Sequence, residues 1–148
     1  MTGGRLMTVR WQMGTAVFLV GLGIAGSAWS HGDVVPHAVD TTGLTPLGED
    51  LHAENPYRDQ ADYPLAQEIG SKAFNQNCAR CHGLGAVSGG IAPDLRLLVP
   101  VDDAGSFLGR VMGGSVRNGV TYMPAFEGVL SQEAIWAVRS WLDTVAEQ

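Results

Sequence analysis

Cysteine, histidine and basic residues are all scarce in this chain of 148 residues, and each shortage excludes a class of protein. Nine lysines and arginines stand against 15 aspartates and glutamates, which argues against nucleic-acid binding. Three of the four histidines, His31, His37 and His52, lie upstream of both cysteines without the spacing of a zinc finger. An apolar fraction of 45% indicates one ordinary globular domain with room for an appendage.

The two cysteines stand together in the segment Cys78-Ala79-Arg80-Cys81-His82. On one helical turn, residues at i, i+3 and i+4 project from a single face. Two thiols placed in this way can reach the two vinyl groups along one porphyrin edge, while His82 gives an imidazole nitrogen to the iron. The pattern therefore predicts one covalently attached haem c, with Cys78 and Cys81 as attachment residues and His82 as an axial ligand.

Other uses of a close cysteine pair fit less well. A thioredoxin-like redox pair requires a strand followed by a helix, and a structural disulfide needs no histidine after it. Zinc would need two further ligands at suitable spacing. With only two cysteines, the sequence allows one haem and leaves none for a disulfide.

The first thirty residues have the pattern of an export signal. Arg5 and Arg10 precede an uncharged apolar run over residues 13–25, and Ala28-Trp29-Ser30 places small residues where a signal peptidase cleaves. We expect cleavage before His31 and a periplasmic protein with no stable membrane insertion. A retained anchor is the alternative, but the run is interrupted by glycines and is short of the about 20 residues that span a membrane. The mature chain would keep 7 basic and 15 acidic residues, so its partners should tolerate or welcome an acidic surface.

Residues 31–64 predict an extended arm, because four prolines interrupt a polar segment that has no sustained apolar period. Its scattered apolar side chains suffice for it to lie against the domain, and one short helical turn is expected over residues 50–55. After Pro64 the pattern becomes helical, with a helix into the attachment site that Asp62 caps. A second helix is expected from Asp102 or Asp103 to Met112, and a third from a cap at Ser131 to Val145. The residues expected to line the haem pocket are Leu95, Leu98, Phe107, Leu108 and Val111.

The second axial ligand distinguishes a carrier from an enzyme. Met112 and Met123 are the methionines that remain after removal of residues 1–30. Met112 is placed on a predicted helix and is more simply a core residue, whereas Met123 lies in a segment, residues 119–126, whose glycine and proline break any helix. Thioether with imidazole is a common axial pair, so we predict that Met123 binds the iron. The protein would then move single electrons and catalyse no reaction, whereas an open iron site would indicate a haem enzyme or sensor.

The order of these features resembles a class I cytochrome c over residues 65–148. The shared motifs are Gly70 and Phe74 before the attachment site, Pro93 and Met123-Pro124 after it, and Trp141-Leu142 near the end. The resemblance implies an all-α fold, with three main helices around the haem and an N-terminal arm. It also implies that Gly70 and Phe74 meet the last helix at Trp141. The Pro93 carbonyl is further implied to accept a hydrogen bond from His82, so that Pro93 orients this ligand without binding the iron itself.

A closer likeness extends over most of the mature chain. It is carried by His31-Gly32-Asp33-Val34, Asn55-Pro56-Tyr57-Arg58, and the segments 75–83 and 88–96. These segments are similar to the periplasmic cytochromes c that serve quinoprotein ethanol dehydrogenases. The likeness implies a monomer that accepts electrons from a pyrroloquinoline quinone (PQQ) alcohol dehydrogenase and delivers them toward a terminal oxidase or another cytochrome.

Several points stay open at the level of the sequence. A general respiratory carrier with another donor is one alternative, and a permanent dehydrogenase subunit is another. Docking is expected at the haem edge, near Ala79, Arg80, Gly83 and residues 122–125. Arg96 and Arg117 either pair with the haem propionates or are surface charges.

Overall fold

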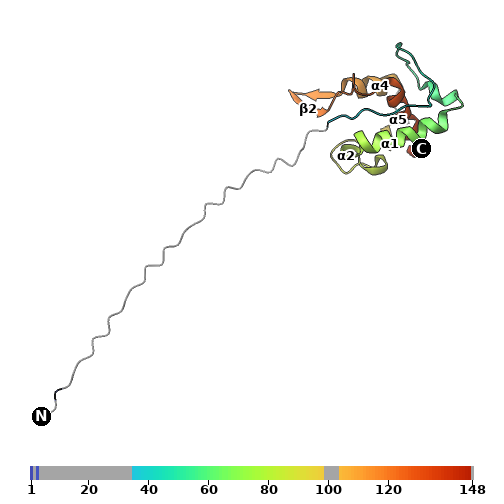
Figure 1. The fold of residues 1–148 in the computed structure, drawn as a ribbon. Helices are drawn as coiled ribbons and strands as arrows, with labels where there is room; N and C mark the ends of the chain where they lie inside the picture. Colours follow the sequence, from blue (N-terminus) through green and yellow to red (C-terminus); the bar gives the residue numbers. More distant parts are fainter. Residues whose placement is uncertain (2, 4–34, 99–103, 148) are drawn as a thin grey trace. The chain divides into compact units, whose positions relative to one another are not determined.

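The computed structural model describes residues 1, 3, 35–98 and 104–147. The predicted signal peptide, its cleavage point between Ser30 and His31, and the predicted cap at Asp102 or Asp103 lie outside the described residues. Regular structure in the described part is mostly helical (Figure 1), which confirms the predicted fold class. The elements are η1 (Pro56–Asp59), α1 (Tyr63–Asn77), α2 (Ala79–His82), η2 (Leu84–Ala86), α3 (Leu95–Leu98), α4 (Ala104–Gly113), β1 (Ser115–Arg117), β2 (Val120–Met123) and α5 (Gln132–Val145).

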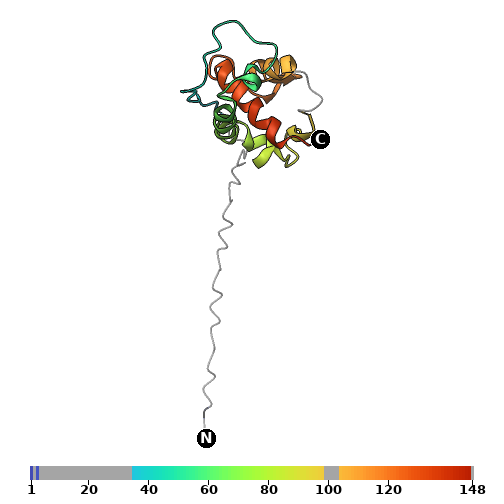
Figure 2. The same ribbon diagram turned by 90° about the vertical axis from the view of Figure 1, so that its right-hand side faces the viewer.

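Helices α1 and α5 cross in close contact, and both ribbon views show them side by side (Figures 1 and 2). Gly70 permits the crossing, because a Cβ atom at this position would lie 1.8 Å from the carbonyl oxygen of Ala137. One turn later, the rings of Phe74 and Trp141 have centroids 4.6 Å apart. The predicted contact between Phe74 and Trp141 is thus confirmed, whereas Gly70 meets the backbone at Ala137 rather than the tryptophan ring.

The cap residues of these two helices behave differently. Ser131 caps α5 as predicted, since its hydroxyl oxygen accepts a hydrogen bond from the Ala134 N–H at 3.3 Å. Asp62 precedes α1 but makes no side-chain cap bond. Its carboxylate instead accepts a hydrogen bond from the Thr45 N–H at 2.6 Å, so it binds an earlier part of the arm. The two positions differ because Asp62 has a competing partner from a distant segment.

The arm packs against α5 through polar contacts distant in sequence. The Leu47 N–H donates to the Glu133 carboxylate at 3.0 Å, and the Gln132 amide donates to the carbonyl oxygens of Gly48 and Asp50. Because α1 and the arm both pack on α5, residues 134–140 are all buried. The expectation that the arm lies against the domain is confirmed for its described part.

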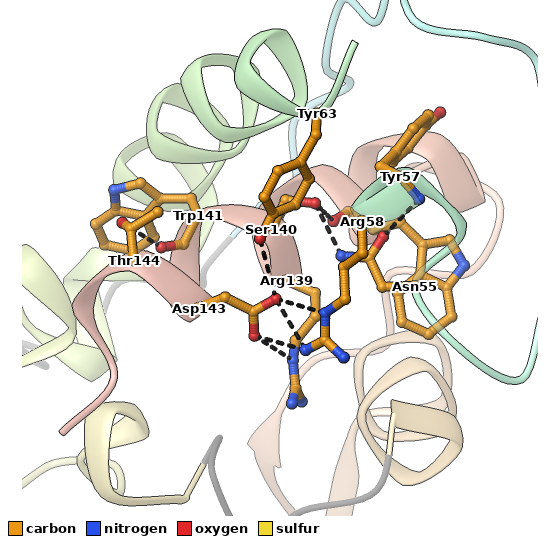
Figure 3. Close-up of polar contacts among 10 residues, drawn as sticks. Asn55, Tyr57, Arg58, Tyr63, Arg139, Ser140, Trp141, Asp143 and Thr144 are labelled. Carbon is orange, nitrogen blue, oxygen red and sulfur yellow. Dashed lines mark hydrogen bonds and ion pairs between the residues drawn. The ribbon is translucent and has the colours of Figure 1, made fainter. Parts of the chain in front are cut away.

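Near the start of α1 the arm is fixed by a second set of contacts (Figure 3). The Asn55 side chain donates to the Ser140 hydroxyl at 2.9 Å, and Arg58 donates two hydrogen bonds to Asp143, at 3.0 and 2.9 Å. Tyr57 is fully buried between them, which raises the pKa of its hydroxyl, and this hydroxyl donates to the Thr45 carbonyl. The helical turn expected over residues 50–55 is absent from the assigned elements, and η1 follows Asn55 instead.

The segment between α4 and α5 contains an antiparallel hairpin that the sequence analysis missed. Strands β1 and β2 pair with Arg117 opposite Val120, which leaves Asn118 and Gly119 as a two-residue turn. Both turn residues have positive φ, 51° and 76°, as a type I′ turn requires. Residues 119–126, expected as a loop, therefore contain strand β2 up to Met123, and only residues 124–126 are irregular.

We predict that Gly70→Ala lowers the free energy of unfolding by about 2 kcal/mol or more, because the added methyl group would overlap the Ala137 carbonyl. Gly109→Ala in α4 is the matched control, since nothing lies within 4 Å of a Cβ there and alanine favours a helix by up to about 1 kcal/mol. Denaturant unfolding measures both. Equal stability of the two variants would contradict a close backbone crossing at Gly70.

Candidate haem site

The attachment residues lie on one tight turn at the end of α1. The Cys78 N–H still bonds to the Phe74 carbonyl at 2.8 Å, and the N–H groups of Cys81 and His82 both bond to the Cys78 carbonyl, at 3.1 and 3.0 Å. Gly83 then ends the turn with φ +80°, where a Cβ would lie 1.8 Å from the Val87 carbonyl oxygen. The structure thus brings Cys78, Cys81 and His82 together on the turn that their spacing predicts.

Cys78 is partly buried and packs against the core. Burial, together with the neighbouring Cys81, raises the pKa of its thiol to about 12. A thiolate is therefore disfavoured at this position, whereas a thioether carries no ionisable group and is compatible with burial. The surroundings of Cys78 fit a covalent haem better than a reactive thiol.

His82 is oriented by a carbonyl group from a separate loop. Its Nδ1 lies 2.9 Å from the Pro93 carbonyl oxygen, the contact that the family resemblance implied. A carbonyl can only accept, so Nδ1 carries the proton, and in the neutral imidazole Nε2 then keeps a free lone pair. That tautomer is the one that can bind a metal ion through Nε2, and it fits the haem iron.

Met123 is held at the end of β2 by the backbone around it. Gly114 has φ +66°, and a Cβ there would lie 2.5 Å from the Met123 carbonyl oxygen, so the two chain segments touch through their backbones. Three residues later the Phe126 N–H bonds to the carbonyls of Val111 and Met112, both at 3.1 Å. The Met123 side chain is partly buried and packs against the core. Both of its flanks are therefore fixed to the end of α4.

The predicted lining and charged residues have mixed outcomes. Phe107 and Leu108 are buried, Leu95 and Val111 are partly buried, and Leu98 is 42% exposed. Arg96 pairs with Asp94 and Glu147 of this chain, and the Arg117 guanidinium lies 5.9 Å from the centre of the Tyr122 ring. Ala79, expected at an exposed edge, is buried in the core cluster at the start of α2.

One structural contact beside the site escaped the sequence analysis. The buried side chain of Asn77, next to Cys78, accepts a hydrogen bond from the His37 N–H at 2.7 Å. The start of the described arm is thereby attached to the helix that carries the cysteines. An asparagine in the last turn of a helix gives no signal of such a distant partner. The Asn118-Gly119 pair, in contrast, is a recognised hairpin signal that could have revealed β1 and β2.

Sequence comparison assigns the family. The sequence model of the family described as cytochrome C oxidase, cbb3-type, subunit III matches residues 66–142. Cytochrome c550 of Pseudomonas aeruginosa is 54% identical over 129 residues, which cover 86% of this chain and 89% of that protein. The chain belongs to the cytochrome c family. It is therefore an electron-transfer protein rather than an enzyme, and it carries covalently bound haem c.

Two further relatives match about half of this cytochrome c. Cytochrome c6 of Anabaena variabilis is 35% identical over 78 residues, which cover 53% of this chain and 90% of that protein. The quinohemoprotein alcohol dehydrogenase ADH-IIG of Pseudomonas putida is 40% identical over 75 residues, which are 51% of this chain and 10% of that enzyme. No solved structure matches. Among the described residues, no helix has the length and apolar character needed to cross a membrane.

Replacing both Cys78 and Cys81 with serine should abolish covalent haem, because a serine hydroxyl does not form the thioether bonds. The test is whether pigment stays with the polypeptide after denaturation and extraction with acidified solvent. The Ser71→Ala variant in the middle of α1 leaves the motif intact and should retain its pigment. Pigment that stays bound to the double serine variant would contradict the assignment.

Proposed function

We propose that this cytochrome c is a periplasmic carrier of single electrons, with His82 and Met123 as the axial ligands of one haem. Its donor is a quinoprotein (PQQ) alcohol dehydrogenase, and its acceptor is a terminal oxidase or another cytochrome. The observation that carries the proposal is the contact between His82 Nδ1 and the Pro93 carbonyl oxygen, because it fixes the tautomer that a haem ligand needs. The relatives named as cytochromes support the electron-carrier role.

Each residue of the site has a distinct task in this proposal. Cys78 and Cys81 hold the group covalently from one turn of helix, and His82 presents Nε2 while Pro93 keeps its Nδ1 proton in place. Met123 would supply the second iron ligand from a segment attached to α4. Haem supplies a one-electron couple, and a thioether ligand raises its reduction potential and excludes oxygen from the iron. Electron transfer then requires no residue to bind a substrate.

The choice of donor is supported by two comparisons. The match to part of a quinohemoprotein alcohol dehydrogenase shows that a domain similar to this chain occurs in a protein of that name. The sequence likeness to cytochromes that serve quinoprotein ethanol dehydrogenases points to the same class of donor. Cytochrome c6, whose name includes no dehydrogenase, is also a relative, so a general respiratory carrier is the alternative.

The docking surface is proposed around α2 and the hairpin. Arg80 is exposed on α2, and Tyr122 and Val120 on β2 are 67% and 57% exposed. Among the described residues, neither Arg80 nor Arg117 pairs with a carboxylate, whereas Arg58, Lys72, Arg96 and Arg139 all do. In the described part of this acidic protein, Arg80 and Arg117 thus lack a carboxylate partner, and Arg117 lies beside the exposed ring of Tyr122. Such a surface suits a partner with carboxylates around its electron exit.

Replacement of Met123 with alanine should lower the reduction potential and let carbon monoxide bind rapidly to the reduced protein, because the axial thioether is lost. Met112→Ala is the matched control, since Met112 is also partly buried against the core. That variant should lose about 2 kcal/mol or more of stability and keep the parent spectrum. A Met123→Ala protein with the parent spectrum would remove Met123 from the site, and rapid carbon monoxide binding by the parent would indicate a haem enzyme or sensor.

The donor is tested by rapid mixing of the oxidised mature protein with a substrate-reduced quinoprotein ethanol dehydrogenase. We expect fast, saturable haem reduction that slows as salt rises, because charge steers the encounter. Tyr122→Ser should lower the second-order rate constant of haem reduction by about 5- to 10-fold, the effect of losing one well-placed interface side chain. Leu51→Ser, which alters an arm residue that is 60% exposed, is the control and should react like the parent. Slow reduction by the dehydrogenase, with fast reduction by small donors, would favour a general respiratory carrier.

A further inference from the structure

Pro93 can orient His82 only if its own carbonyl group is held in place. The proline ring fixes φ, so the direction of the carbonyl depends on the peptide plane between Pro93 and Asp94. This peptide plane lies in a loop between η2 and α3 rather than in a regular element. The loop must therefore be held by contacts other than the backbone hydrogen bonds of a helix or sheet.

The side chains on either side of Pro93 form a closed set of contacts. The Ser88 hydroxyl donates to the Ala92 carbonyl, and the Ser88 N–H donates to the Asp94 carboxylate at 3.3 Å. Arg96 donates three hydrogen bonds to the same carboxylate: from its backbone N–H at 3.1 Å, from Nε at 3.1 Å and from Nη2 at 2.9 Å. The residues before and after Pro93 are thus both tied to side chains.

Arg96 also connects this loop to the end of α5. Its Nη1 lies 2.5 Å from the Glu147 carboxylate, and its carbonyl oxygen accepts a hydrogen bond from the Glu147 N–H at 3.0 Å. The side chains of Arg96 and Asp94 are 24% and 18% exposed, so this ion pair is more sheltered than the Lys72–Glu68 pair, which is 73% and 63% exposed. The Arg96 guanidinium holds the pKa of the Asp94 carboxyl below its usual value, which keeps the carboxylate charged at neutral pH.

We propose that Arg96, through Asp94 and Glu147, is a positioning residue that holds the Pro93 carbonyl against His82 and so sets the reduction potential of the haem. The inference rests on His82 as an axial ligand, as proposed above. A firm hydrogen bond to Nδ1 makes the imidazole a stronger donor and favours the oxidised iron. A loosened bond favours the reduced iron and raises the potential.

The decisive variant is Arg96→Lys, because it keeps the charge and loses the bidentate contact with Asp94. We expect the equilibrium between oxidised and reduced haem to shift toward the reduced form several-fold, and by no more than about tenfold, or about 59 mV for a one-electron couple. The His82 Nδ1 proton should also exchange faster with solvent, as proton nuclear magnetic resonance of the reduced protein would show.

Arg58→Lys is the matched control. Arg58 also makes a bidentate contact with an aspartate, Asp143 on α5, but this contact does not involve the Pro93 loop (Figure 3). The control should lose stability and keep both the parent potential and the parent exchange rate. This comparison separates a positioning role from a general effect of weakening an arginine–aspartate pair.

Arg96→Gln tests the direction in which the reduction potential changes. Loss of a cation near the haem should by itself favour the positively charged, oxidised iron and lower the potential, whereas a released Pro93 carbonyl should raise it. A raised potential supports the proposal. A lowered potential in Arg96→Gln, or a parent-like potential and exchange rate in Arg96→Lys, would overturn it. The spectrum of the parent protein tests the proposed function separately, because a parent without histidine–methionine ligation would overturn that function. Failure of the Arg96 variants in a parent that has this ligation would overturn only the positioning role of Arg96.

Discussion

The close crossing of α1 and α5 at Gly70 is the constraint on which the rest of the structure depends. Because no side chain separates the backbones there, the two helices have one possible depth of contact. Helix α1 then positions Cys78 at its end and, through the bond of the His82 N–H to the Cys78 carbonyl, the turn that carries His82. Helix α5 positions the Arg96–Glu147 contact just beyond its own end. The two partners of the bond between His82 and Pro93 are therefore positioned by the same pair of helices.

The arm completes this framework although its sequence is polar. Within residues 35–64, Tyr57 and Leu44 are the buried hydrophobic side chains. Ordering an extended segment is costly in conformational entropy, and apolar burial on this scale offsets only part of it. The remaining stabilisation comes from hydrogen bonds between the arm and the buried or partly buried polar side chains of Gln132, Glu133 and Ser140. The arm and α5 thus satisfy each other's polar groups.

The sequence predicted those features that are local or that follow a short spacing rule. The attachment turn, the helices α1 and α5, and the Ser131 cap all belong to this class, and the resemblance to class I cytochromes c supplied the pairing of Phe74 with Trp141. The bonds of Asn77 to His37 and of Asp62 to Thr45 join residues far apart in the chain, and no periodicity encodes such pairs. Arg96 shows the same limit, because its position in the sequence allowed two roles and its carboxylate partners, Asp94 and Glu147, are visible only in the fold.

The proposed axial ligands come from two parts of the molecule that the protein holds separately. His82 is fixed through α1 and the Pro93 loop, whereas Met123 is fixed through Gly114 and the end of α4. Ligation by both would join these parts through the iron, and a group that binds only the folded chain stabilises it. Because each ligand is positioned by hydrogen bonds or backbone contact before it binds, little rearrangement is needed when the iron changes charge. A carrier benefits from that rigidity, since every structural change that accompanies electron transfer would slow it.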